Sequence, residues 1–374
     1  MKRMGKFSVL LLLVTCVLLS SCHVVRFFVW NFADIRDYKK FPKIDMPKDG
    51  VEFKFTNADK DTKVKLPKDI TIKKKKFDFM GYLKKTKTVA FLVIRNDSIL
   101  NQEYLFGYTK ESIVPSFSMA KSFTSMLLGI AIEEGAIKNV NEPITKYLPE
   151  LTKPGFEKIT IEHLLNMRSG IRFDEGYINP FGDVAKYYYG VNISKYIKHL
   201  RIKKEPDTEF EYISLNTQLL GMIIERAVHK SLVDYMEEKI WKYIGAEYDA
   251  SWSIDSKKDK EVKAFCCFNA RTVDFAKLGR LYLNKGNWNG KQIIPEQWVK
   301  KSIDITGSKN DGIYTYQWWH TWQGKGADFF AQGLLGQFVY VYPSKNIIIV
   351  RLGKKEGKGD WPWPGLPCNL DCYS

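Results

Sequence analysis

The sequence predicts an α+β fold in which both chain ends contribute strands to one antiparallel sheet, with flanking helices and a mostly helical inserted region. Three observations support this prediction. Residues 88–105 are typical of a β-hairpin, because two β-rich runs flank Asn96-Asp97. Residues 139–298 show mostly helical periodicity. Strand-like runs then return at 315–322, 329–342 and 346–352, which favours a single sheet closed by both termini.

The composition is that of a globular protein with one large domain or two closely packed ones. Of the 374 residues, 45% are hydrophobic, and no internal repeat or low-complexity tract interrupts them. The net charge of +16 is spread along the chain, and its densest run, residues 73–76, indicates a solvated face or an edge strand. No nucleic-acid-binding module is visible, so the charge favours anionic lipid headgroups or acidic envelope polymers as partners.

The first 22 residues are typical of a lipoprotein-type signal peptide. Lys2, Arg3 and Lys6 precede an apolar stretch over residues 7–19, which is shorter than the roughly 20 residues needed to cross a bilayer. The sequence Leu19-Ser20-Ser21-Cys22 that follows resembles a bacterial lipobox, with Cys22 as the lipidated residue. An uncleaved membrane anchor is the alternative. Both interpretations place the protein in the bacterial cell envelope, anchored to a membrane and facing the periplasm or the exterior.

The rest of the chain divides into an N-terminal extension (23–83) that packs on the domain, the main domain (84–353) and a polar tail (354–374). Five scattered histidines, and four cysteines without C-x-x-C spacing, predict no metal and no other cofactor. The adjacent Cys266 and Cys267 are expected as buried thiols. An oxidising compartment would allow a disulfide between Cys368 and Cys372, and the sequence leaves the pairing open.

Ser118 and Lys121 form the first candidate catalytic pair. They stand three residues apart at the start of an apolar-periodic run that predicts a helix ending at Gly135. Residues at this spacing lie on one helix face, so the lysine can take the proton of a serine nucleophile if burial or a neighbouring cation lowers its pKa. The competing interpretation is a capping serine beside a solvated lysine, and only further elements of the chain decide between the two.

Two later segments supply such elements. Tyr212 opens a loop before a predicted helix, and a phenol there can pass a proton to a leaving group when a nearby ammonium lowers its pKa. Alternating core aromatics at Phe210 and Tyr212 are the other interpretation. In the late strand, Gly333 would let substrate approach the backbone, and the Leu334 and Ser118 amides would form an oxyanion hole. A β-bulge is the competing explanation of that glycine.

Ser118-x-x-Lys121, Tyr212 and the Gly333 strand, in this order, resemble the serine β-lactamase and penicillin-binding protein superfamily. The resemblance implies a β-lactamase/transpeptidase-like fold. Two other segments, residues 141–150 and 159–170, resemble the class C β-lactamase and esterase branch of this superfamily. Two more resemble members of the 6-aminohexanoate-dimer hydrolase type, namely residues 212–221 and 331–337.

The resemblance implies a role for each matching residue. Ser118 is the acylated nucleophile, Lys121 its base and Tyr212 the proton-shuttling phenol, while the amides of Ser118 and Leu334 form the oxyanion hole. The residues implied to bind substrate are Tyr188, Ser214, Gly333 and Gln337.

Two departures from the superfamily pattern change the expected substrate. The Tyr-x-Asn pattern reads Tyr212-Ile213-Ser214, and the Lys-Thr-Gly pattern reads Ala331-Gln332-Gly333. The second change removes the cation that would hold a β-lactam carboxylate, a contact worth about 1.5–3 kcal/mol. We therefore expect an esterase or amidase that works on a small acyl substrate through an acyl-enzyme.

Two alternatives stay open at this stage. The first is a peptidoglycan peptidase or β-lactamase, and the second is a non-catalytic envelope binding protein of the same fold. A Ser-His-Asp hydrolase is disfavoured because no G-x-S-x-G elbow occurs. The expected partners are a small ester or amide and a membrane reached through the lipid anchor, without nucleic acid. The sequence does not indicate an oligomeric state.

Overall fold

The computed structural model describes residues 23–30, 32–58, 68–72, 75–310, 312–321 and 327–356. The expected signal peptide with Cys22, and Cys368 and Cys372 of the tail, lie outside the described residues. Within these ranges no helix has the length and apolar character of a membrane span. No cluster of three or more potential metal-ligating side chains occurs in the same ranges.

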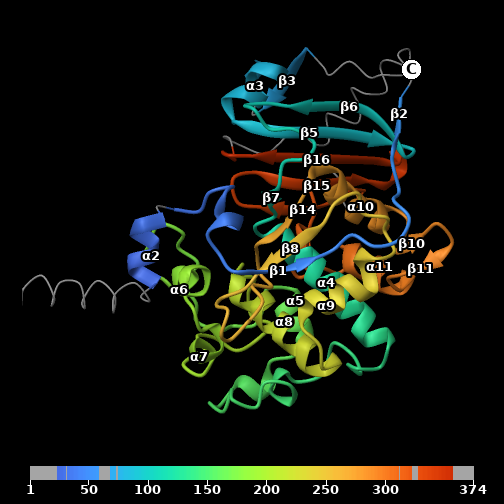
Figure 1. The fold of residues 1–374 in the computed structure, drawn as a ribbon. Coiled ribbons are helices and arrows are strands. Elements are labelled where there is room, and N and C mark those ends of the chain that lie inside the picture. Colours follow the sequence, from blue (N-terminus) through green and yellow to red (C-terminus); the bar gives the residue numbers. More distant parts are fainter. Residues whose placement is uncertain are drawn as a thin grey trace, which may run out of the picture.

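The centre of the fold is an eight-stranded sheet in the order β12-β13-β14-β15-β16-β5-β6-β2 (Figure 1). Its neighbouring strands run antiparallel apart from β2 and β6, which are parallel. Both ends of the chain contribute to it, so the expected α+β architecture is confirmed. Its strands are β2 (Thr56–Asn57), β5 (Thr88–Arg95), β6 (Ser98–Tyr104), β12 (Tyr314–Thr315), β13 (Trp318–Trp319), β14 (Phe329–Gly333), β15 (Gln337–Tyr342) and β16 (Ile347–Gly353).

A smaller sheet and two hairpins complete the strands. The smaller sheet has the order β1-β8-β9-β7, and its strands are β1 (Lys43–Met46), β7 (Val114–Pro115), β8 (Ala250–Ser253) and β9 (Phe268–Ala270). The hairpins pair β3 (Asp69–Ile72) with β4 (Lys75–Asp78) and β10 (Asn287–Trp288) with β11 (Lys291–Gln292). The inserted region is therefore less purely helical than expected, because β8 to β11 lie within it.

Most helices lie on the side of the large sheet that carries α10, below the strands in Figure 1. The α-helices are α2 (His23–Trp30), α3 (Phe79–Lys85), α4 (Met119–Glu133), α5 (Ile161–Leu165), α6 (Asp183–Tyr189), α7 (Ile193–Ile197), α8 (Ser214–Val228), α9 (Leu232–Met236), α10 (Thr272–Leu283) and α11 (Glu296–Ile303). Shorter turns are η1 (Asp37–Lys39), η2 (Ile144–Lys146), η3 (Phe156–Lys158), a π-type turn η4 (Glu237–Trp241) and η5 (Pro343–Lys345).

The large sheet is buried on both faces because side chains alternate along its strands. In β5, Leu92 and Ile94 join the main core together with α4 and α10, whereas Phe91 and Val93 join a second core with Phe79 of α3. Such a strand reads as an uninterrupted apolar run, which is how residues 88–95 appear in the sequence.

Two of the expected strands are each broken by a turn. The run 315–322 forms parts of β12 and β13, because Tyr316 (φ 43°) and Gln317 (φ 72°) adopt left-handed conformations between them. The run 329–342 forms β14 and β15, which are joined by a turn with Leu335 at φ 65° and Gly336 at φ 79°. This second turn carries Leu334, one of the two expected oxyanion-hole residues.

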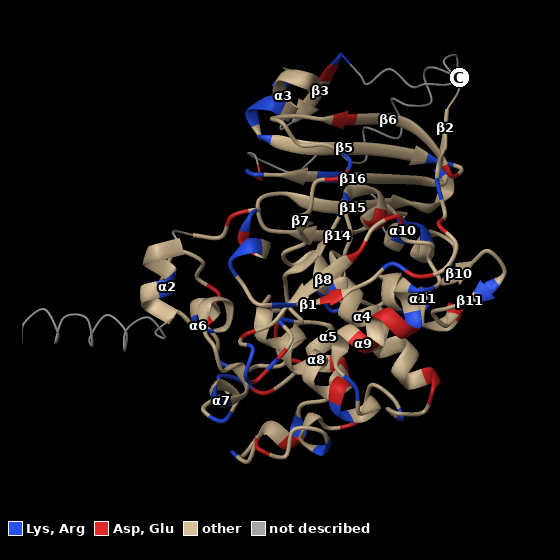
Figure 2. Ribbon diagram, in the orientation of Figure 1, with Lys and Arg blue, Asp and Glu red and all other residues tan. Residues whose placement is uncertain are grey.

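Charged side chains are interspersed over the molecule. Figure 2 shows Lys and Arg spread over helices and loops beside Asp and Glu. Lys75 and Lys76 of the densest basic run lie exposed in β4, where Lys76 pairs with Asp69 at 2.9 Å. These residues form a solvated hairpin, as the sequence suggested.

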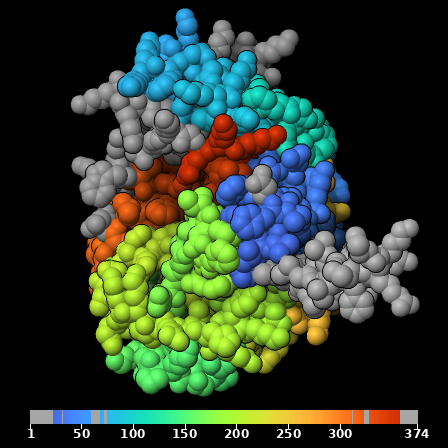
Figure 3. Space-filling view, turned by 90° about the vertical axis from the view of Figure 1, so that its left-hand side faces the viewer, coloured from blue at the N-terminus to red at the C-terminus, as the bar shows by residue number. Residues whose placement is uncertain are grey.

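The N-terminal segment crosses the molecule to reach the helical region. Helix α2 packs on α6, with the Phe27 ring 5.4 Å from that of Tyr189. Figure 3 shows the blue N-terminal segment directly against the green segment that contains α6. Sequence-distant residues are thereby brought together at one site.

Candidate active site

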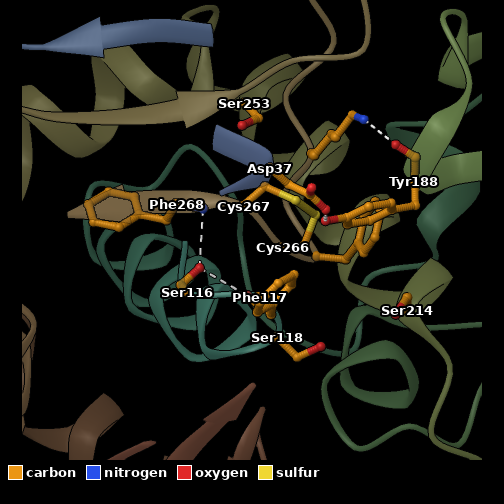
Figure 4. Close-up of a disulfide and its surroundings, with 12 residues drawn as sticks. Asp37, Ser116, Phe117, Ser118, Tyr188, Ser214, Ser253, Cys266, Cys267 and Phe268 are labelled. Carbon is orange, nitrogen blue, oxygen red and sulfur yellow. Dashed lines mark hydrogen bonds between the residues drawn. A yellow bond between two sulfur atoms is a disulfide. The ribbon is translucent and has the colours of Figure 1, made fainter. Parts of the chain in front are cut away.

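Ser118 occupies a sharp turn between β7 and α4. The preceding Phe117 has φ 44°, a left-handed conformation that is costly for a bulky residue. Ser116 stabilises this turn, since its Oγ donates to the Phe117 carbonyl (2.9 Å) and accepts from the Phe268 amide (3.1 Å) (Figure 4). Ser118 is the N-cap of α4, but its side chain makes no capping hydrogen bond. The interpretation as a capping serine is therefore wrong.

Lys121 is buried one turn into α4, with 1% of its surface exposed. Its Nζ lies 2.8 Å from Ser118 Oγ, 3.2 Å from Ser214 Oγ and 3.1 Å from the Phe265 carbonyl oxygen. Burial lowers the pKa of Lys121 to about 8, and the negative charge of Glu175 opposes that decrease. The interpretation as a solvated lysine is therefore wrong.

The partners of Lys121 suit an amine that acts as a base. A neutral amine has two N–H groups and one lone pair. Ser214 Oγ and the Phe265 carbonyl can accept from the two N–H groups, which leaves the lone pair for the hydroxyl proton of Ser118. The proton donor and acceptor thus already lie within hydrogen-bond distance.

Tyr212 lies close to the same amine. Its ring centroid is 5.1 Å from Lys121 Nζ, and it packs against Trp319 at 5.3 Å. Burial raises the pKa of Tyr212, while a hydrogen bond with the Ser118 side chain opposes the increase. The expected lowering of this pKa by a nearby ammonium is therefore wrong, and the phenol stays protonated near neutral pH. Phe210 is also a packing aromatic, with its ring 5.5 Å from Tyr314, but Tyr212 alone of the two reaches Ser118.

Glu175 and Tyr177 are site residues that the sequence analysis missed. Glu175 Oε2 accepts from the Ser214 amide (2.7 Å), and its Oε1 accepts from Ser214 Oγ (2.5 Å) and from the Tyr177 hydroxyl (2.7 Å). The expected substrate residue Ser214 is thus a link between Glu175 and Lys121. The loop that carries Glu175 lies about 40 residues before Ser214, and no local pattern in the sequence joins the two.

Leu334 and Ser118, whose main-chain amides are the expected oxyanion hole, line the same cavity. Among the described residues, neither amide donates a hydrogen bond to a protein acceptor. Gly333 itself is needed for chain packing, because a Cβ there would lie 2.2 Å from the Ser116 carbonyl oxygen. The glycine therefore lets β14 approach the Ser116 backbone, and Gly333 is not among the described residues that line the cavity.

Tyr188 and Gln337 have partners that turn their polar groups away from Ser118. The Tyr188 hydroxyl donates to Asp37 (2.8 Å), so only its ring contributes to the cavity wall. The Gln337 amide bonds the main chain of Gly353 and the Leu334 carbonyl, and it does not line the cavity. The structure supports a positioning role for Gln337 at the end of β15 in place of direct substrate contact.

A disulfide joins the adjacent Cys266 and Cys267, so the expectation of buried thiols is wrong. Cys266 lines the cavity beside Ser118 and Ser214 (Figure 4). Its main chain is continuous with Phe265, whose carbonyl accepts from Lys121. Because the cross-link restrains the main chain at this point, it helps to fix one of the acceptors of the Lys121 amine.

We predict that removing this disulfide weakens the site without dismantling it. In the double variant Cys266→Ala, Cys267→Gly, the glycine accepts the positive φ of 69° at position 267. Turnover of a short-chain ester should fall about fivefold, which corresponds to about 1 kcal/mol for one poorly held hydrogen bond. Treating the wild-type protein with a phosphine reductant should give a matching loss. A double variant with wild-type kcat, or a wild-type protein whose kcat the reductant leaves unchanged, would exclude this role.

The cavity in front of Ser118 is apolar and has a volume of about 210 Å³. No charged residue is among the described residues that line it. Its walls come from the N-terminal segment, the 177–189 region and the β14–β15 turn, and the lining residues are Phe27, Phe32, Ala33, Phe117, Ser118, Tyr177, Ile178, Val184, Ala185, Tyr188, Tyr189, Ser214, Phe265, Cys266, Leu334 and Leu335.

A family model described as "Beta-lactamase" matches residues 79–361. The chain belongs to the beta-lactamase family. It is 27% identical over 314 residues to a 6-aminohexanoate-dimer hydrolase of Paenarthrobacter ureafaciens, covering 78% of this chain and 79% of that one. The expected superfamily is thereby confirmed, and with it a family of hydrolases.

Solved structures of this beta-lactamase fold agree. A putative 6-aminohexanoate-dimer hydrolase from Bacillus anthracis is 22% identical and superposes with a TM-score of 0.72 over 92% of each chain. A family VIII carboxylesterase is 15% identical, with a TM-score of 0.62 over 79% of this chain and 95% of that chain. At these identities the two structures support the fold. This beta-lactamase-family chain differs from the lysine-bearing members in having Ala331-Gln332-Gly333 on β14.

Proposed function

We propose that the protein is a serine hydrolase that cleaves small esters or amides with an apolar acyl group through an acyl-enzyme. The observation that carries the proposal is the buried Lys121 amine, 2.8 Å from Ser118 Oγ and with its pKa lowered to about 8. A base with a pKa near the working pH can remove a hydroxyl proton efficiently. The relation to 6-aminohexanoate-dimer hydrolase supports the same class of reaction.

In the first half of the reaction, Ser118 Oγ bonds to the substrate carbonyl carbon while its proton passes to Lys121. The amides of Ser118 and Leu334 stabilise the oxyanion that forms. The bond to the leaving group then breaks, and Tyr212 delivers a proton to the departing alcohol or amine. Lys121 then reprotonates Tyr212 with the proton that it took from Ser118. In the second half, water attacks the acyl-enzyme by the reverse route and releases the acid.

The cavity supports an apolar acyl group. No cation is among its described lining residues, so nothing in the wall attracts a carboxylate such as that of a β-lactam. Its aromatic and aliphatic lining instead favours hydrocarbon, at about 25 cal/mol for each Å² removed from water. Esters and amides are therefore better candidate substrates than penicillins.

Mass spectrometry of the acylated protein tests this proposal. The protein is exposed to a fluorophosphonate and to a panel of esters, amides and a β-lactam, and the adduct is then mapped. We expect the adduct on Ser118 with the fluorophosphonate and with slowly deacylating esters. Ser118→Ala should remain unmodified. A protein that reacts with none of the probes, or that is labelled on another residue, would refute the proposed nucleophile.

We also propose that the chain is a lipoprotein of the bacterial cell envelope, with the lipid on Cys22. The basic residues, short apolar stretch and lipobox-like sequence before Cys22 support this proposal. Mass analysis of the N-terminal peptide should find a diacylglyceryl group on Cys22. An unmodified Cys22 in the protein purified from membranes would contradict it.

A further inference from the structure

Exposed apolar side chains are concentrated on two segments of the molecule. Nine large apolar side chains are exposed in the described part of the chain, and six of them belong to these segments. Phe28 (66% exposed) and Val29 (70%) of α2, with Phe32, form one group. Tyr177, Ile178 (79%) and Phe181 (69%) of the 177–181 loop form the other. We call these six residues the apolar rim.

The apolar rim is continuous with the cavity in front of Ser118. Phe32, Tyr177 and Ile178 line the cavity as well as being exposed, so they form its mouth. In α2, Phe27 faces inward and contacts the ring of Phe32 at 5.4 Å, whereas the next residue, Phe28, faces outward. An apolar surface thus extends from solvent to the nucleophile. Soluble monomers rarely leave a contiguous patch of this kind exposed without a partner.

The position of α2 identifies the partner. The described part of this helix starts at His23, the residue after Cys22, which carries the lipid in the proposed function. A lipid there would hold α2, and hence the rim, against the membrane surface. Aromatic and aliphatic side chains on the exposed face of such a segment are typical of surfaces that enter the headgroup region. The net charge of +16 adds attraction to anionic lipids.

We propose that the apolar rim docks into the anchoring membrane, so that the acyl group of a membrane-dissolved ester or amide passes along the rim into the cavity. This inference rests on the proposed function, because it names where that function finds its substrate. The covalent step is unchanged: the Ser118 Oγ–acyl bond forms, the bond to the alcohol or amine breaks, and the leaving group takes the proton. The rim adds a route that keeps the acyl chain out of water.

The test compares one enzyme on two substrates. The lipidated protein is reconstituted in vesicles of phosphatidylglycerol and phosphatidylethanolamine. It is assayed with p-nitrophenyl octanoate dissolved in the vesicles and with p-nitrophenyl acetate in the water. The rim variant is Phe28→Ser, Val29→Ser, Phe181→Ser, whose three positions do not line the cavity. The matched control is Val51→Ser, Phe106→Ser, which removes exposed apolar side chains elsewhere.

We expect the rim variant to lose about tenfold or more in kcat/KM on the vesicle-held ester, because three apolar contacts with lipid are removed. Its kcat/KM on the acetate ester should stay within about twofold of wild type, and the control should match wild type on both substrates. Wild-type rates of the rim variant on the vesicle-held ester would overturn the proposal. So would a parallel loss on both esters, or a wild-type enzyme that leaves the vesicle-held ester intact while cleaving acetate. Absence of Ser118-dependent cleavage of either ester would instead refute the proposed function.

Discussion

Replacing Ser118 by alanine should lower kcat for a chromogenic short-chain ester by about ten-thousandfold or more, because no other group can form the acyl-enzyme. The substitution should leave the fold intact. The hydroxyl does not cap α4, and the sharp turn at Phe117 is stabilised by Ser116. The measurement is steady-state hydrolysis of p-nitrophenyl acetate, with the thermal unfolding midpoint as a check on folding.

Ser125→Ala is the matched control for that variant. Ser125 is a buried serine of the same helix that does not line the cavity. Its substitution should leave turnover within a few-fold of wild type. If Ser118→Ala and Ser125→Ala hydrolyse the ester equally well, Ser118 is not the nucleophile.

Lys121→Met should lower kcat by about a hundredfold to ten-thousandfold, the usual contribution of a positioned general base. Methionine fills a similar volume without an amine, so Ser118 keeps its place but loses its proton acceptor. The fold should survive, because burial disfavours the charged amine and the variant removes that cost. The readout is kcat for the acetate ester together with the free energy of unfolding in urea.

Lys263→Met separates a catalytic role from the general effect of losing a buried lysine. Lys263 is also fully buried, and burial lowers its pKa to about 7, yet it bonds the Tyr188 carbonyl and not Ser118. This variant should keep most of its ester turnover. Equal losses in the two methionine variants would show that Lys121 acts through packing alone.

The pairing of Ser118 with Lys121 could be predicted because the two residues are close in the sequence. Ser118 and Lys121 lie three residues apart, and the α-helical spacing alone puts them on one face. The hairpin of β5 and β6 was also predictable from its two β-rich runs on either side of the Asn96-Asp97 turn. Tyr212 needed the resemblance to a known superfamily, since nothing local relates it to a serine 94 positions earlier in the chain.

The unpredicted features all depend on long-range contacts or on unusual backbone conformations. Glu175 contacts Ser214, the first residue of α8, across 39 positions of the sequence. The turn that carries Leu334 interrupts residues 329–342, which look like one strand in the sequence. The sequence does not show that Leu335 adopts the left-handed conformation that forms this turn. Adjacent cysteines are usually read as separate thiols, and the sequence does not show the left-handed conformation of Cys267 (φ 69°) that accompanies the Cys266–Cys267 bond.

The pH dependence of kcat/KM for the acetate ester tests the account most directly, because this ratio reports the pKa values of the free enzyme. The Lys121 amine must be neutral to act, so activity should rise with pH through an inflection near 8, where its pKa lies. Since burial raises the pKa of Tyr212, the activity should then stay level at higher pH while that phenol remains protonated. A profile that is flat from about pH 6 to 9, or that rises only near the ordinary lysine pKa of about 10.4, would contradict the assignment of Lys121 as the base.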